Sequence, residues 1–179
     1  TNKADDFILT AGKLKEYGYR EVNLNLGCPS RTVVSKYRGS GFLARPEELD
    51  RFLYEVFEKT ETDISVKTRT GRDSPQEFVR LMEIYNKYPL KELIIHPRTQ
   101  QDFYKNTPDL SVFAQALSVS RCPVCYNGDI FTTEDLKVFR ARFANVDKVM
   151  LGRGLLVNPM LIEMAEDGTA IDTERKRKF

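Results

Sequence analysis

The sequence has no apolar run that approaches the roughly 18 residues needed to cross a membrane as a helix. Its first residues, TNKADDFILTAGK, also lack the basic, then apolar, then small-residue order of a secretory signal peptide. Hydrophobic residues make up 41% and charged residues 30% of the chain, which is typical of a globular domain. We therefore expect a protein of the cytoplasm.

Histidine and cysteine are scarce, with one histidine and three cysteines in 179 residues. Cys122 and Cys125 have C-x-x-C spacing, but a structural zinc site needs four ligands and His96 is the only histidine. The pair lies in an apolar, strand-like run, in which residues three apart point to opposite faces. We expect these two cysteines to pack in the core, and we expect no metal site.

No G-x-G-x-x-G follows a first strand, which disfavours a dinucleotide-binding fold. Instead, strand-like and helix-like runs alternate. The strands are expected at 21–26, 63–69, 92–97, 123–128 and 147–154, and the helices at 4–17, 46–59, 74–87, 109–117, 133–143 and from 159. A spacing of roughly 25 to 42 residues between strands fits right-handed βαβ units, so the fold class is α/β with parallel strands.

Polar residues follow every predicted strand, in the segments NLGC, VKTR, IHPR, YNGD and LGRG. An active site assembled from many strand ends is typical of a (β/α)8 TIM barrel, whereas a doubly wound sheet binds at one switch point. Such a barrel has eight strands and about 250 residues. The chain is therefore predicted to hold about five C-terminal β/α units, with residues 1–165 as a partial barrel.

The side chains at these strand ends suit a phosphorylated cofactor with a polar ring. Lys67 and Arg69 share one face of a strand, and His96 and Arg98 do the same on the next strand, so each pair offers cationic donors. Asn127 and Asp129 flank a glycine that leaves room for a ligand, and the Gly-Arg-Gly turn at 152–154 precedes a helix N-terminus that suits a phosphate. The candidate residues are Lys67, Arg69, His96, Arg98, Asn127, Asp129, Gly152 and Arg153.

Cys28 lies at the end of the first predicted strand, between Gly27 and Pro29 and three residues after Asn25. An unperturbed thiol has a pKa of about 8.5 and is mostly protonated at neutral pH. It can donate a proton, or it can act as a nucleophile if a base such as His96 activates it. The residues alone leave the acid, the nucleophile and a structural role open.

Residues 31–45 contain Arg31, Lys36, Arg38 and Arg45 and no acidic residue. Such a segment is either a solvated face or a contact surface for a polyanion.

The segments NLNLGCPSRTVVSKYRGSGFL, SVKTRTG, IIHPRTQQDFY, YNGDI and LGRGLLVNP together resemble the tRNA-dihydrouridine synthase family. The similarity covers about residues 4–165 in the right order and spacing. It implies a flavin-containing (β/α)8 barrel followed by a helical domain that helps to hold tRNA. Residues 166–179 would then begin the linker to that helical domain.

The resemblance also implies a reaction, in which FMN reduced by NADPH saturates the C5–C6 bond of a uracil in tRNA. Hydride would pass to C6, and Cys28 would donate a proton to C5 as general acid. The implied cofactor-binding residues are Lys67, His96, Asn127, Asp129, Gly152 and Arg153, and the implied substrate-binding residues are Asn25, Arg69, Arg98, Arg31, Lys36 and Arg38. Tyr104 could stack on a base.

The sequence departs from the family pattern at Pro97 and Tyr126, where the family commonly has a small residue. The first strands of the family's barrel, which carry flavin contacts, have no counterpart here. Two alternatives are a non-catalytic RNA-binding fragment and another FMN-dependent TIM-barrel oxidoreductase. An incomplete barrel would also expose two sheet edges, which favour dimerisation or aggregation.

We predict that this chain alone binds FMN weakly or not at all and has no synthase activity, because the flavin contacts of the first strands are missing. The absorbance spectrum of the purified chain measures bound flavin directly. Stoichiometric FMN in that spectrum would contradict the prediction.

Overall fold

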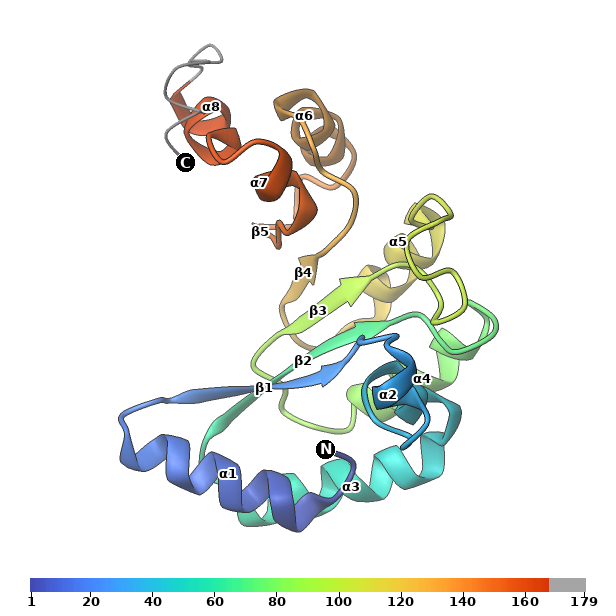
Figure 1. Ribbon diagram of the computed structural model, residues 1–179, viewed down its shortest axis with the longest axis vertical. Coiled ribbons are helices and arrows are strands. Elements are labelled where there is room, and N and C mark those ends of the chain that lie inside the picture. The colour runs from blue at the N-terminus through green and yellow to red at the C-terminus, as the bar shows by residue number, and fades with distance from the viewer. Residues whose placement is uncertain (168–179) are drawn as a thin grey trace. The chain divides into compact units, whose positions relative to one another are not determined.

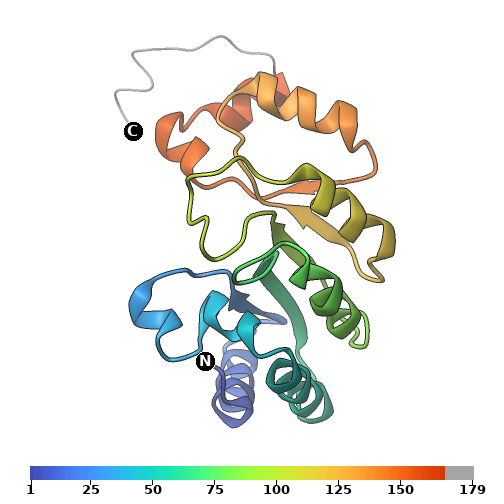
Figure 2. The same ribbon diagram turned by 90° about the vertical axis from the view of Figure 1, so that its right-hand side faces the viewer.

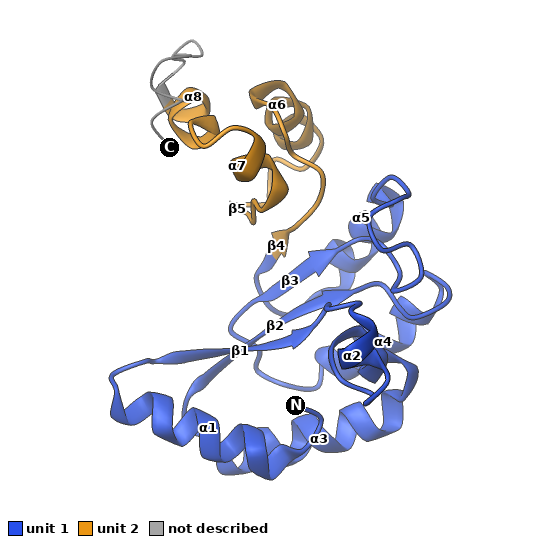
Figure 3. Cartoon of the chain, viewed as in Figure 1, with its two compact units in different colours: residues 1–124 blue, residues 125–179 orange. Residues whose placement is uncertain are grey.

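The computed structural model describes residues 1–167, which form two compact units (Figure 3). The first unit comprises Thr1–Val124 and the second begins at Cys125. The boundary falls inside strand β4 (Val124–Tyr126). Each unit is described by itself below.

The first unit alternates helices and strands along the chain (Figure 1). Its elements are α1 (Ala4–Glu16), β1 (Glu21–Leu26), α2 (Arg31–Val34), the 3-10 helix η1 (Gly39–Ala44), α3 (Pro46–Lys59), β2 (Asp63–Arg69), α4 (Glu77–Tyr85), β3 (Leu93–His96) and α5 (Leu110–Val119). Strands β1 and β2 pair in parallel, and so do β2 and β3.

The sheet of the first unit has one apolar and one polar face. In β1, Val22, Leu24 and Leu26 are buried, whereas the alternate residues Asn23 and Asn25 are exposed. Helices α1 and α3 lie side by side beneath the β1–β2 pair (Figures 1 and 2) and bury the apolar face. The polar face continues into β2, where Ser65 is buried and Lys67 is half-buried.

The register carries the polar face across the neighbouring strands. Asn23 lies opposite Ser65, and its Nδ2 donates to the Ser65 hydroxyl at 2.9 Å. Asn25 lies opposite Lys67, and Arg69 lies opposite His96. Parallel pairing therefore gathers residues that are about 70 positions apart in sequence into one polar surface.

The second unit contains β5 (Lys148–Val149), α6 (Thr133–Arg142), α7 (Arg153–Val157) and α8 (Leu161–Asp167). Strands β4 and β5 pair in parallel. Helix α6 begins with a capping box, in which the Thr132 hydroxyl accepts from the Asp135 N–H and the Asp135 carboxylate accepts from the Thr132 N–H. The Tyr126 ring stacks on Phe139 of α6 at 4.1 Å between centroids.

The observed elements confirm the predicted α/β class with parallel strands, and the strands at 21–26 and 63–69 have their predicted bounds. The last strand, predicted at 147–154, spans only Lys148–Val149, and residues 153 and 154 of the predicted strand begin α7 instead. Gly154 permits this turn, since a Cβ there would lie 2.1 Å from the Ile130 carbonyl oxygen. Within the part of the chain that the structure describes, no helix is long and apolar enough to span a membrane. Residues 168–179 of the predicted linker lie outside the described residues.

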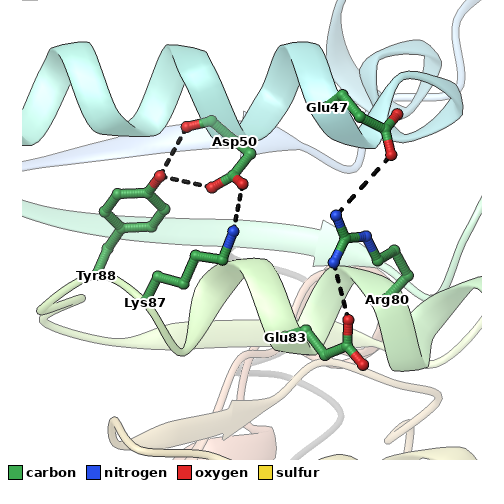
Figure 4. Close-up of polar contacts among 6 residues, drawn as sticks. All are labelled: Glu47, Asp50, Arg80, Glu83, Lys87 and Tyr88. Atoms are coloured by element: carbon green, nitrogen blue, oxygen red, sulfur yellow. Dashed lines mark hydrogen bonds and ion pairs between the residues drawn. The ribbon is translucent and has the colours of Figure 1, made fainter.

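A polar network ties α3 to α4 and to the turn that follows it (Figure 4). The Tyr88 hydroxyl donates to the Asp50 carboxylate at 2.6 Å and lies 2.7 Å from the Asp50 carbonyl oxygen. Lys87 also pairs with the Asp50 carboxylate. Burial acts to raise the pKa of Asp50, but the hydrogen bonds from Lys87 and Tyr88 outweigh it and lower the pKa below the ordinary carboxyl value.

We predict that Tyr88→Phe destabilises the chain by about 1 kcal/mol at neutral pH, because it removes a hydroxyl hydrogen bond to a partly buried carboxylate. A carboxyl whose pKa is lowered in the folded state stabilises above its ordinary value, and the effect is lost as pH falls through the lowered value. The deficit of Tyr88→Phe should therefore shrink in acid. Urea unfolding at several pH values measures it, with the exposed Tyr17→Phe as control. A deficit that does not change with pH would contradict the assignment.

Candidate active site at the strand ends

The backbone around Cys28 is fixed from two sides. The Asn25 side-chain oxygen accepts hydrogen bonds from the backbone N–H groups of Gly27 and Cys28, each at 3.0 Å. The backbone N–H and the hydroxyl of Ser40 donate to the Cys28 carbonyl at 3.0 and 2.9 Å. Gly39, at φ 53°, lies so close that a Cβ would be 2.6 Å from this same carbonyl oxygen. The half-buried thiol therefore projects from a defined turn.

Asn25, predicted to bind substrate, uses its side-chain oxygen for this turn. Its Nδ2 group is the part of the side chain that can donate to a ligand. The structure thus gives Asn25 an additional role in shaping the Cys28 turn.

Lys67 lies opposite Asn25 on the polar face and is half-buried. Its Nζ is 3.8 Å from the place that a Cβ on Gly27 would take. The ammonium group therefore lies beside the turn that leads into Cys28. This confirms the predicted placement of Lys67 on the same face as Arg69, and its contact with a cofactor stays a prediction.

Arg69 is almost fully buried, with 1% of its surface exposed. Its guanidinium donates to three backbone carbonyls, those of Gly27 at 2.9 Å, Thr99 at 2.7 Å and Phe103 at 2.8 Å. Burial lowers its pKa from the ordinary arginine value, and the group stays charged because a guanidinium does not lose its proton in proteins. Arg69 therefore links the ends of β1, β2 and β3. Its predicted contact with substrate stays a prediction.

His96 and Arg98 are in contact at the end of β3. Arg98 Nη1 lies 3.0 Å from His96 Nε2, and Arg98 Nε donates to the Asn106 carbonyl oxygen. Both residues are buried. The sequence predicts that they share one face, and the structure brings them together.

The loop from Thr99 to Asn106 is organised around Asp102. The Asp102 carboxylate accepts from the backbone N–H and the hydroxyl of Thr99 at 2.7 and 2.8 Å, and from the Asn106 amide. Burial acts to raise the pKa of Asp102, but these hydrogen bonds lower it below its ordinary value. The exposed Tyr104 ring lies 6.0 Å from the His96 ring and 5.4 Å from the Arg69 guanidinium.

The basic segment after Cys28, which lies outside every predicted helix and strand, folds into α2 and η1. Arg31 and Lys36 are exposed, and Arg38 is half-buried with its Nε 3.4 Å from the Asn2 side-chain oxygen. The Arg45 guanidinium stacks over the Tyr37 ring at 3.4 Å from its centroid. The segment thus presents cations and an aromatic ring on a defined backbone.

The remaining predicted residues belong to the second unit. Asn127 Nδ2 donates to the Met150 carbonyl at 2.8 Å, so Asn127 links the ends of β4 and β5. Arg153 pairs with Asp129, and Gly152 is exposed before α7. These four candidates lie at the ends of β4 and β5 or in the segments that follow them.

Some residues shape the backbone of the site without taking part in the chemistry, and the sequence alone does not predict them. Ser40 and Gly39 fix the Cys28 carbonyl, and the Gly-Ser-Gly signal after the basic segment could have indicated a close approach. Tyr126, a departure from the family pattern, explains the glycine at 128, because a Cβ there would lie 1.9 Å from the Tyr126 hydroxyl oxygen.

The two other cysteines are not in disulfides. Cys125 is buried, and burial raises the pKa of the half-buried Cys122 thiol. Among residues 1–167, no group of three or more histidine, cysteine or acidic side chains could hold a metal ion.

Comparison with known proteins shows first the fold and then the family. Histamine dehydrogenase from Rhizobium sp. 4-9 matches 92% of this chain with 27% of its own, at a TM-score of 0.62 and 12% identity, which is a likeness of fold alone. The chain belongs to the dihydrouridine synthase family, whose model matches residues 1–179. The resemblance seen in the sequence motifs is thereby confirmed.

Two curated relatives illustrate the similarity. tRNA-dihydrouridine synthase B of Pasteurella multocida is 29% identical over 152 residues, covering 84% of this chain and 46% of the relative. tRNA-dihydrouridine(16) synthase of Pseudomonas putida is 33% identical over 158 residues, covering 86% and 49%. The chain spans about half the length of these relatives.

We predict that Arg69→Met destabilises the chain by about 3 kcal/mol or more, because three carbonyls lose their charged donor in a buried site. Arg72→Met is the matched control, since the Arg72 side chain is 47% exposed, and it should cost less than about 0.5 kcal/mol. Urea unfolding gives both values. Equal unfolding midpoints for the two variants would show that the Arg69 link is not structural.

Proposed function

We propose that this chain is part of a tRNA-dihydrouridine synthase, an enzyme that reduces the C5–C6 bond of a uracil base in tRNA. The observation that carries the proposal is the match of the dihydrouridine synthase model to the whole chain. The names of the curated relatives support tRNA as the substrate. In this proposal, the chain supplies about five C-terminal β/α units of a (β/α)8 barrel, and it works in the cytoplasm.

The proposed cofactor is FMN, with NADPH as the reductant. The donor set fits such a group, because an anionic phosphate and a carbonyl-rich ring need cations and N–H donors. The residues proposed to hold it are Lys67, His96, Asn127, Asp129, Gly152 and Arg153. When bound, reduced FMN supplies the electron pair and the hydrogen that add at C6 of the uracil.

Cys28 is the proposed general acid. Addition at C6 places negative charge on C5 of the base, and the Sγ–H proton of Cys28 transfers to C5 as the S–H bond breaks. The resulting thiolate regains a proton from water. The hydrogen bonds of Asn25 and Ser40 to the Cys28 backbone support this role, because a proton donor must be held within reach of one carbon atom.

The basic segment supports the proposed RNA contact. A base in folded tRNA must leave its stack to enter an active site, and phosphates beside it need cations. Arg31, Lys36 and Arg38 follow Cys28 directly on α2 and the turn after it. They would hold the tRNA backbone, while Asn25, Arg69 and Arg98 are proposed at the uracil itself.

We predict that Cys28→Ala lowers dihydrouridine formation by about a hundredfold or more while leaving flavin binding unchanged, since it removes the general acid and no cofactor contact. The test expresses the full coding sequence in a strain that lacks dihydrouridine synthases, and mass spectrometry measures dihydrouridine in its tRNA. Cys122→Ala is the control, because Cys122 precedes the N-terminal end of β4, whereas Cys28 follows the C-terminal end of β1. Near-normal dihydrouridine in the Cys28→Ala strain would overturn the acid assignment.

A further inference from the structure

The contact between Arg98 and His96 limits the chemistry of the histidine. Arg98 is 3% exposed, and its guanidinium donates to the Asn106 carbonyl oxygen and lies 3.0 Å from His96 Nε2. A guanidinium has five N–H donors and no acceptor, and it does not lose its proton in proteins. Arg98 can therefore only donate to the imidazole.

An acceptor nitrogen of imidazole carries no proton. In a neutral imidazole, one ring nitrogen donates and the other accepts. Because Nε2 accepts from Arg98, the proton of His96 resides on Nδ1. The partner of one ring nitrogen thus decides which nitrogen carries the proton. The same rule applies to metal-bound histidines, where a hydrogen bond to the nitrogen that does not bind the metal fixes the tautomer.

We propose that Arg98 is a positioning residue that fixes His96 in the Nδ1–H tautomer, so that any hydrogen bond between this ring and the flavin comes from an N–H donor and not from a basic nitrogen. This inference rests on the proposed function for its ligand, the carbonyl-rich flavin ring. The tautomer itself follows from the contact and can be measured without any ligand.

The tautomer also bears on Cys28. A nucleophilic cysteine needs a neighbouring base with a lone pair to take its proton. The single lone pair on the neutral His96 ring is engaged by Arg98, and Nδ1 has none to offer. His96 thus cannot serve as that base while the Arg98 contact holds, which favours the acid role of Cys28.

The test is a nitrogen NMR spectrum of the chain labelled with 15N-histidine. The chain has one histidine, so the spectrum contains one pair of ring nitrogens and needs no assignment among residues. At about pH 8, above the ordinary imidazole value of about 6.5, we expect Nδ1 at the protonated position and Nε2 at the unprotonated position. The reverse pattern in the wild-type chain would overturn the proposal.

Three variants separate the tautomer from general damage. Arg98→Met removes the hydrogen-bond donor and should raise the fraction of the Nε2–H tautomer. Arg98→Lys keeps a cationic group that can only donate, and it should retain the Nδ1–H tautomer. Asp102→Asn disturbs the same loop but leaves Arg98 in place, and it should not change the tautomer. An unchanged tautomer in folded Arg98→Met would contradict the proposal. If Arg98→Met does not fold, the wild-type spectrum decides alone.

A flavin titration tests the ligand part of the inference in the product of the full coding sequence. Arg98→Met should weaken FMN binding by about fivefold to tenfold, the effect of one misplaced hydrogen bond, and Arg98→Lys should restore most of it. Equal FMN affinity in wild type and Arg98→Met would refute the positioning role. Failure of the proposed function would show differently, as an Nδ1–H tautomer in a protein that forms no dihydrouridine.

Discussion

The buried guanidinium of Arg69 is the interaction on which the candidate site depends. It comes from the end of β2 and donates to Gly27 after β1 and to Thr99 and Phe103 after β3. Parallel strands bring their carboxyl ends to one edge, but the loops beyond them have no ladder to hold them. One charged group with several donors provides that connection, and the three carbonyls supply the hydrogen-bond partners that a buried guanidinium needs.

The position of the thiol follows from this link. Gly27 is anchored by Arg69, and the next residue is Cys28, whose N–H and carbonyl are bound by Asn25 and Ser40. The Arg69 guanidinium also bonds the Phe103 carbonyl in the loop that contains Tyr104. Arg98 bonds the same loop at the Asn106 carbonyl. Arg98 then sets the hydrogen bonding of His96. Two buried arginines thus position the proposed acid, Cys28, and one proposed flavin ligand, His96.

The sequence was sufficient where local pattern decides the structure. Alternation in EVNLNL places Asn25 on the face opposite the core, and Lys67 and Arg69 share a face for the same reason. The burial of Arg69 could not be predicted, because its three acceptors lie 30 to 42 residues away in loops whose paths depend on the fold. Helix α2 and η1 were missed because the packing of Gly39 against Cys28 shapes them.

The central claim is that this chain belongs to an enzyme that reduces uridine in tRNA. Mass-spectrometric mapping of tRNA, with and without the gene that encodes this chain, tests it most directly. The account predicts that deletion removes dihydrouridine from a defined tRNA position and that the gene restores it. Identical dihydrouridine maps in the two strains, with no dihydrouridine formed when the gene is expressed in a host that lacks such enzymes, would contradict the account.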